Sequence, residues 1–551
     1  MSLSELRRVN NAFRWSAACC ALVAAVLWLG PYLLRADVFA DDMTQHVFWM
    51  YRFVDPALFP NDLSVAYFGD SSAAPWGYQA LYRVLAQFMD LQVASEGVAV
   101  LLLMLSAWLA WCLGAASGDR YPELRALCAV VVVLMLLPLR LTDVMSPAGL
   151  QRSFALALML LCLWALVARR YAWVGVSWLL AALFYPVVLV VQGLASVVIF
   201  TRDLLRERCL PPAAISNGVL GVVALLIAVV NSRTPPGIGP TVTGNEARAM
   251  AEFYPGGRLP MFGMSFYGDW FNDHHLALGW SFYSLLLLSI ALLIVWWKRR
   301  LGSIPAAGWV MAIVGLGVWF ISRQMLFTLY LPNRHARWSL ACFAVLAFSA
   351  AASAVIAPLF DRMASRSARA SSGLQWSIAL LAPILVASAL LPGALRDYRQ
   401  PRDQDMERAY QFIAGLPKDT LVAAHPDLAD YVPLRSRRSV LVSTEISLPF
   451  MLGYYRQLKP RIEASLRAAY ATDFQEMDAA LSPFGVKVML TNASVWDKQG
   501  YFKPFDRLVH DLRERGDRLG YALRAPPSER VLFQSGNVYV VKVGADAGPS
   551  S

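Results

Sequence analysis

The chain has 551 residues, of which 57% are hydrophobic and 16% are charged, whereas a soluble protein carries about 25% charged residues. Its formal net charge is +11, but the basic residues sit in short segments between apolar runs and form no basic stripe, which argues against nucleic acid as a partner. Charges are evenly mixed only in about the last 155 residues, so the composition predicts membrane-embedded α-helices followed by one soluble domain.

The first apolar run covers residues 15–34 and follows Arg7, Arg8 and Arg14. It is long for a signal peptide and ends without a suitable cleavage site, so we interpret it as a retained membrane helix. Because a span needs roughly 20 apolar residues, the whole chain predicts about eleven spans. They cover residues 15–34, 94–116, 124–141, 153–168, 171–185, 187–201, 213–231, 276–297, 304–321, 338–358 and 374–393.

The loop after the first helix contains two adjacent carboxylates, Asp41 and Asp42, followed by His46. In a helix that starts at Asp42, His46 would lie on the same face, because four residues make about one turn. The aromatic residues at 48–51 suit a helix that lies in the membrane interface. The alternative is that the carboxylates cap this helix and interact with its dipole. Capping needs one Asp, however, and the loop has two.

Residues 171–201 form one apolar run that is long for a single span and short for two. Pro186 interrupts the run after Phe184 and Tyr185, and proline removes a backbone donor and clashes with the preceding turn. The run therefore forms either one broken helix or two short ones. Two are favoured, because eleven crossings bring all the short basic segments to one side. These segments are residues 7–14, 120–125, 169–170, 202–208, 298–300 and 362–369.

The same rule places the N-terminus in the cytoplasm and the C-terminus outside. The outer side then receives every long, chemically mixed segment, including the loops at 35–94 and 232–275. We therefore expect the function at the outer face. In the second of these loops, Asp273, His274 and His275 suggest a metal site, but adjacent histidines point in different directions and no other ligand spacing supports one. A solvated loop is the better interpretation, although a divalent metal stays open.

The last outer loop leads into a membrane helix through Arg334 and Arg337, three residues apart on one helical face. Arginines at this edge suit a lipid-linked phosphate, because the planar guanidinium bonds phosphate oxygens in pairs. The alternative is that both side chains reach out to ordinary lipid headgroups. Arg140 and Arg152, which flank another outer loop, are weaker candidates for the same phosphate-binding role.

The soluble domain is predicted at residues 396–551, after a membrane module at 1–395. Residues 420–424, 439–443 and 486–491 predict short buried strands, and they alternate with helices at 458–470 and 474–481. A hairpin is expected at 531–534 and 538–543. The fold class is therefore an α-helical polytopic membrane protein with a C-terminal soluble α/β domain.

This layout resembles the GT-C superfamily of membrane glycosyltransferases. Asp41 and Asp42 stand where that superfamily has its acidic motif, residues 184–186 look like its aromatic-proline break, and residues 332–334 look like its late arginine element. The resemblance implies a polyprenyl-phosphate-linked sugar donor and a glycan, lipid or protein acceptor. It implies direct, inverting transfer of a hexosyl or pentosyl group at the outer face of a bacterial cytoplasmic (inner) membrane.

By this resemblance, Asp41 or Asp42 would be the catalytic base that deprotonates an acceptor hydroxyl. Arg334 and Arg337 would stabilise the departing polyprenyl phosphate, and His46, Arg152 and Arg140 would assist at the donor. Two other classes stay open. A transporter or flippase of lipid-linked saccharides would carry charges in mid-membrane and internal repeats, and the sequence shows neither. A non-catalytic assembly or sensor protein would use the outer domain for contacts.

Overall fold

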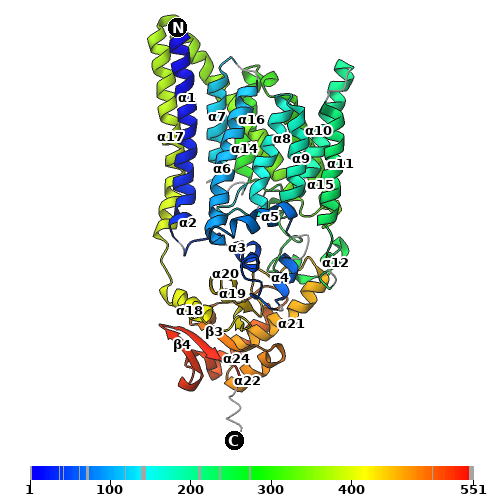
Figure 1. The fold of residues 1–551 in the computed structure, drawn as a ribbon, viewed down its shortest axis with the longest axis vertical. Coiled ribbons are helices and arrows are strands. Elements are labelled where there is room, and N and C mark those ends of the chain that lie inside the picture. Colours follow the sequence, from blue (N-terminus) through cyan, green and yellow to red (C-terminus); the bar gives the residue numbers. More distant parts are fainter. Residues whose placement is uncertain are drawn as a thin grey trace.

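The computed structural model describes residues 3–35, 37–40, 42–60, 62–69, 74–117, 120–137, 144–208, 213–234, 237–271, 275–498 and 500–544. A bundle of long helices forms one end of the molecule and a small mixed-sheet domain forms the other (Figure 1). Helix α1 (Leu3–Ala24) starts at the end of the bundle far from the sheet domain (Figure 1). A mostly helical bundle therefore precedes a C-terminal mixed-sheet domain in the chain.

A helix covers each of the predicted apolar segments in the part of the chain that the structure describes. Six helices are long and apolar enough to cross a membrane by length and composition, and four more are shorter apolar helices. The first segment is continuous through α1 (Leu3–Ala24), η1 (Ala25–Leu29) and α2 (Gly30–Leu34). The others are α6 (Leu91–Ala116), α7 (Pro122–Leu136), α8 (Phe154–Val167), α9 (Tyr171–Phe184), α10 (Val187–Glu207), α11 (Ala213–Asn231), α14 (Phe282–Trp297), α15 (Ala306–Gln324), α16 (Asn333–Arg366) and α17 (Ala368–Arg399).

The apolar run at 171–201 forms two helices, α9 and α10, that pack against each other. The break falls at Tyr185 and Pro186, because proline has no N–H to continue the hydrogen-bond ladder of α9. Tyr185 leaves the helical region with φ −153° and ψ 81°. The chain thus turns back at this point instead of continuing as one kinked helix.

The long loops that the sequence predicts on the outer side fill the layer between the helical bundle and the sheet domain (Figure 1). This layer contains α3 (Met43–His46), η2 (Phe48–Phe53), α4 (Leu63–Phe68), α5 (Trp76–Leu85), α12 (Gly244–Arg248), η4 (Ala251–Phe253) and α13 (Phe266–Phe271). The aromatic segment at 48–51 was predicted to lie in the membrane interface, but all four of its side chains are buried. That prediction is wrong because these side chains pack within the protein. Phe48 and Trp49 meet Phe59 and Phe53 of the same loop, and Arg437 of the C-terminal domain lies over the ring of Tyr51.

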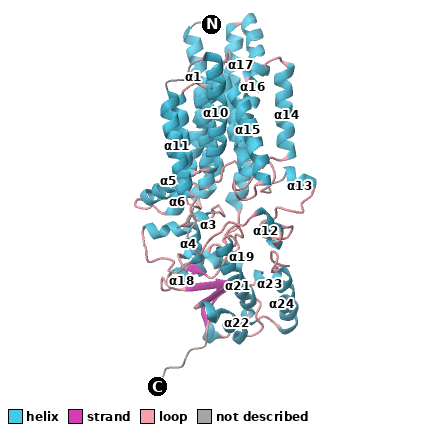
Figure 2. Cartoon of the chain, turned by 90° about the vertical axis from the view of Figure 1, so that its right-hand side faces the viewer, coloured by secondary structure: helices cyan, strands magenta, loops and turns pink. Residues whose placement is uncertain are grey.

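The C-terminal domain is built on a five-stranded mixed sheet with the order β2-β1-β3-β5-β4. Strands β1 (Leu421–Ala424), β2 (Ser439–Val440) and β3 (Val488–Asn492) are parallel, whereas β4 (Val531–Ser535) and β5 (Val538–Lys542) form an antiparallel hairpin. Each strand begins within two residues of its predicted position. The helices are α18 (Gln404–Ala414), α19 (Pro426–Ala429), α20 (Val432–Ser436), α21 (Leu452–Ala469), α22 (Phe474–Leu481), α23 (Ser494–Asp497) and α24 (Asp506–Leu519), and they surround this sheet (Figure 2).

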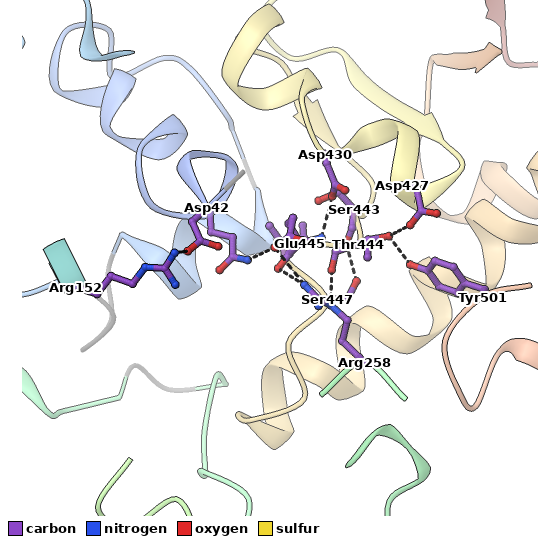
Figure 3. A network of polar contacts seen from close by, with 12 residues as sticks. Asp42, Arg152, Arg258, Asp427, Asp430, Ser443, Thr444, Glu445, Ser447 and Tyr501 are labelled. Atoms are coloured by element: carbon purple, nitrogen blue, oxygen red, sulfur yellow. Dashed lines mark hydrogen bonds and ion pairs between the residues drawn. The ribbon is translucent and has the colours of Figure 1, made fainter. Parts of the chain in front are cut away.

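The carboxyl ends of the parallel strands β1 and β2 lead into loops that face the membrane module. In open α/β sheets this edge is where ligands and functional side chains gather. Here the segment that follows β2, residues 443–447, reaches the first outer loop (Figure 3). The sheet edge therefore positions part of the site described next.

Candidate active site

Asp42 stands at the start of α3, directly above the outer end of the bundle. It occupies the N-cap position but makes no side-chain capping bond, so capping does not account for this carboxylate. Its Oδ2 instead lies 2.6 Å from Nη2 of Arg152, which belongs to the short helix η3 (Gln151–Ser153) at the end of another outer loop (Figure 3). Asp41 lies outside the described residues, so the structure presents Asp42 alone of the two predicted carboxylates.

The electrostatic surroundings keep the Asp42 carboxylate ionised. Burial raises its pKa, but the positive charges of the nearby arginines, Arg152, Arg334 and Arg258, hold it below the ordinary value. In the Asp42–Arg152 pair, 21% of the Asp42 side chain and 26% of the Arg152 side chain are exposed, so solvent screens this pair less than a surface pair. Asp42 is therefore a carboxylate ready to accept a proton at neutral pH.

His46 lies one turn after Asp42, as predicted. Burial and the nearby arginines lower its pKa to about 4, and its ring meets the edge of Phe68 with centroids 5.7 Å apart. The imidazole is therefore neutral at physiological pH. It can donate or accept a hydrogen bond in the site, but it adds no positive charge for a phosphate.

Arg334 begins α16, at the outer end of that long helix, and its charge acts on both Asp42 and His46. The start of α3 and the start of α16 therefore lie within electrostatic range of each other. Within the described part of the chain, the Nε and Nη1 atoms of Arg334 are buried and have no hydrogen-bond partner. Its guanidinium carbon lies 5.9 Å from the ring centre of Trp338. A buried cation with unsatisfied donors carries a desolvation cost that an anion would relieve.

Arg337 lies deeper than Arg334, with 1% of its surface exposed. Its Nε packs where a side chain on Gly279 would stand, because a Cβ there would come within 2.7 Å of it. The backbone oxygen of Arg337 accepts a hydrogen bond from Trp280 Nε1 at 3.0 Å. Arg337 thus packs α16 against the segment at 279–280, and Arg140 lies outside the described residues.

Tyr185, at the break between α9 and α10, joins this cluster. Three arginines lie within electrostatic range of its hydroxyl: Arg334, Arg152 and Arg337. Its ring meets Trp338 edge-on, with centroids 5.3 Å apart. The aromatic-proline break and the late arginine element, which the sequence separates by about 150 residues, are therefore neighbours.

The outer domain adds a group that the sequence did not predict, Glu445. Gln45 on α3 donates a hydrogen bond to Glu445 Oε2, and Arg258 from the long loop lies 3.3 Å from the same oxygen (Figure 3). Arg258 Nε also donates to the backbone oxygen of Thr444 at 2.8 Å. Nothing in the periodicity of the segment 443–447 signals these contacts, because they join parts of the chain that are remote in sequence.

Further polar groups stand behind Glu445. The backbone N–H of Glu445 donates to Asp430 at 2.8 Å, and burial raises the pKa of Asp430 to about 7. Thr444 bonds Asp427, and its hydroxyl lies 2.9 Å from that of Tyr501 (Figure 3). This network ties the carboxyl ends of β1 and β2 to the loop that carries Glu445. Among the described residues, no group of three His, Cys, Asp or Glu side chains is arranged to hold a metal ion.

The fold and the cluster define a class: a polytopic membrane protein whose charged site lies at one end of the bundle, beneath an outer domain. No protein-family model and no curated protein matches the chain. Among solved structures, ArnT from Cupriavidus metallidurans in the apo state is similar over 96% of this chain and 98% of that chain, with 14% identity and a TM-score of 0.51. An oligosaccharyltransferase from Archaeoglobus fulgidus, tethered with an acceptor peptide, is similar over 88% of this chain and 69% of that chain, with 13% identity and a TM-score of 0.47. The likeness to ArnT shows that this chain has the GT-C fold, as the resemblance in sequence implied.

Proposed function

We propose that the chain is a membrane glycosyltransferase that moves a sugar from a polyprenyl-phosphate donor to an acceptor hydroxyl at the outer face. The observation that carries this proposal is that a cation with unbonded donors and an ionised carboxylate lie in one cluster. Arg334 offers buried donors without a partner, and Asp42 offers an ionised carboxylate within its electrostatic range. A transferase of this kind needs both a cation at the leaving phosphate and a base at the acceptor.

Arg334 is the proposed phosphate ligand. When the bond between the anomeric carbon and the phosphate oxygen breaks, the electron pair stays on the oxygen and the phosphate becomes more negative. A guanidinium already held in place stabilises this charge with little reorganisation, and it bonds two phosphate oxygens at once. Arg152 and Tyr185 border the same space, and Arg337 fixes the start of α16 behind it.

Asp42 is the proposed base. As the acceptor oxygen attacks the anomeric carbon, the hydroxyl proton passes to the carboxylate of Asp42, and the configuration at that carbon inverts. The pair with Arg152 makes Asp42 a weaker base but keeps it ionised and oriented. Neutral His46 is placed to hydrogen-bond the carboxylate or the acceptor without adding a second charge.

The topology that this function requires has eleven crossings, with the N-terminus in the cytoplasm and the C-terminal domain outside a bacterial inner membrane. Two features support it. The basic turns at 298–300 and 362–369 end or follow helices that point away from the sheet domain (Figure 1). The site lies at the opposite end, where a donor headgroup meets the membrane surface.

The test is sugar transfer by membranes that contain the full chain, supplied with a polyprenyl-phosphate sugar. The wild type should transfer the sugar, and the Asp42→Asn variant should bind the donor without transferring it. If the wild type binds no donor and transfers no sugar from hexosyl or pentosyl carriers, the non-catalytic alternative gains the support that this proposal loses.

A further inference from the structure

A cavity of about 510 Å³ lies between the first outer loop and the C-terminal domain. One wall comes from residues 51–58 and from the turn that enters α6, and the other comes from the end of α18 and from α20 with the residues that follow it. It shares no lining residue with the cluster of Asp42, His46, Arg152 and Arg334. The proposed glycosyltransferase chemistry gives this cavity no role.

The lining of this cavity is predominantly basic. Four cations line it, Lys418, Arg435, Arg437 and Arg438, against the two carboxylates Asp55 and Asp90. The pairs Lys418–Asp55 at 2.6 Å and Arg437–Asp90 at 3.0 Å have half-exposed cations. Exposed pairs of this kind contribute little stability, roughly 0–1 kcal/mol. An incoming anion therefore exchanges with these carboxylates at low cost.

The deepest cation, Arg438, is 7% exposed. Its hydrogen bonds go to backbone oxygens, including those of Ala414, Leu416 and Arg437, and among the described residues none goes to a carboxylate. Burial lowers the pKa of this guanidinium, and only the charge of Asp55 opposes that effect. A buried charge without a bonded counterion is costly, so the cavity gains stability when it holds an anion.

Two local features direct the wall at residues 436–438 toward the cavity. Arg437 adopts a left-handed conformation with φ +54°, which costs a non-glycine residue on the order of 1 kcal/mol. This turn lets three consecutive residues, Ser436 to Arg438, line the space. The hydroxyl of Ser436 is buried there without a hydrogen-bond partner among the described residues, so it is available to a ligand oxygen.

The rim of the cavity is apolar and lies beside the start of a candidate membrane helix, α6. Val54 and Met89 line the cavity and are 61% and 45% exposed, and the neighbouring Phe88 is 78% exposed. The candidate membrane helix α6 begins at Leu91, directly after Asp90, so we expect this rim next to the point where α6 leaves the bilayer. An amphiphile can therefore place its head among the cations while its chain follows the rim into the membrane.

We propose that this cavity binds the phosphate headgroup of an anionic membrane lipid. Its oxygens would meet Lys418 and Arg437 first, and the uncompensated charge of Arg438 and the Ser436 hydroxyl lie behind them. The site is separate from the transfer chemistry, so its test is binding. Because free phosphate shares the headgroup chemistry, the test must tell the two sources apart.

The test uses the purified full chain and measures retained lipid by native mass spectrometry, with phosphatidic acid and phosphatidylcholine as probes. The wild type should retain phosphatidic acid, and Lys418→Gln combined with Arg437→Gln should lower its occupancy by on the order of tenfold, since each basic residue near a lipid surface contributes about 1 kcal/mol. Arg518→Gln, in the same domain but away from the cavity, should behave as the wild type.

A second variant guards against a trivial loss. Asp55→Asn removes a cavity carboxylate and frees Lys418, so it should retain phosphatidic acid more tightly than the wild type, which a damaged fold would not do. Equal retention by wild type and double variant, equal retention of phosphatidylcholine, or no gain in Asp55→Asn would overturn the proposal. Full displacement of the lipid by millimolar inorganic phosphate would assign the cavity to free phosphate and overturn it as well.

Discussion

Gln45 donates a hydrogen bond to the carboxylate of Glu445, 400 residues further along the chain. Gln45 and Asp42 belong to the same short helix, and Arg258 from a third segment reaches the same carboxylate. The outer domain therefore holds the helix that carries the candidate base. This contact makes the C-terminal domain part of the site, although it contains no candidate catalytic group of its own.

We predict that Glu445→Ala lowers sugar transfer by roughly ten- to a hundredfold, because a displacement of about 1 Å in a reacting group has an effect of this size. The loss should appear in kcat, while the KM for the lipid donor changes little, since Arg334 is untouched. Glu463→Ala is the matched control, because Glu463 is half-exposed and pairs with Arg467 on the domain surface. A kcat equal to that of the control would show that Glu445 does not position α3.

Arg334→Ala should weaken donor binding and turnover together. A hydrogen bond to a charged group contributes about 1.5–3 kcal/mol, which corresponds to roughly ten- to a hundredfold in affinity for the polyprenyl phosphate. Arg334→Lys should restore only part of it, because an ammonium lacks the paired donors of the guanidinium. Donor titration of purified protein measures both effects. Arg396→Ala, at the exposed outer end of α17, is the control, and unchanged donor affinity in Arg334→Ala would remove Arg334 from the phosphate.

The acid limb of the pH–rate profile should lie below the ordinary aspartic acid pKa of about 3.9. The reason is that nearby cations, Arg152 first among them, hold the pKa of Asp42 down against its burial. Because the pKa of Asp42 is lower in the folded chain than in the unfolded chain, ionised Asp42 stabilises the fold at pH values above its unfolded-state pKa. This contribution is lost as the pH falls through its folded-state pKa. Arg152→Gln removes the main cation that lowers the pKa of Asp42, so burial should raise this pKa and the acid limb should move to higher pH. An identical pH–rate profile in the wild type and the variant would show that the ionisation of Asp42 does not control the rate.

The orientation of the chain predicts a specific pair of reporter results. A reporter that is active only outside the cytoplasm should be active after Ser551 and silent after Arg300, because α14 runs from the site toward the opposite end of the bundle (Figure 1). The reverse pair would place the site in the cytoplasm. The donor site proposed at Arg334 would then lie on the side of the membrane opposite to the one proposed.

Much of this architecture follows from local pattern. The apolar runs predict the bundle helices because a chain in lipid must satisfy its backbone hydrogen bonds internally, which a helix does, and Pro186 predicts the break because it cannot continue a helix. The strands of the outer domain are short apolar runs bounded by turns, which is a local signal as well. Asp42, His46 and Arg334 could be singled out because charges beside membrane helices are costly without a role.

Other features depend on contacts that no local pattern encodes. The rings at 48–51 suggest a helix in the membrane interface, because the sequence cannot show that their own loop folds back on Phe48 and Trp49 or that Arg437 lies over Tyr51. Glu445 lies in an ordinary polar loop, and only its hydrogen bond with Gln45 in the folded chain shows that it belongs to the candidate site. Arg334 and Arg337 lie three residues apart, so the sequence predicts the same role for both. Arg337 instead packs against Gly279, because the loop before α14 folds over it.

The most direct test of the central claim is single-turnover sugar transfer by Asp42→Asn, measured beside donor binding in the same membranes. Asn keeps the shape of the side chain but cannot take the acceptor proton, and general base catalysis contributes about a hundred- to ten-thousandfold. Transfer should therefore fall by at least about a hundredfold while donor affinity stays close to that of the wild type. Asp419→Asn, whose partner Lys487 lies on the domain surface, should transfer normally. Normal transfer by Asp42→Asn, alone and combined with Asp41→Asn, would contradict the account.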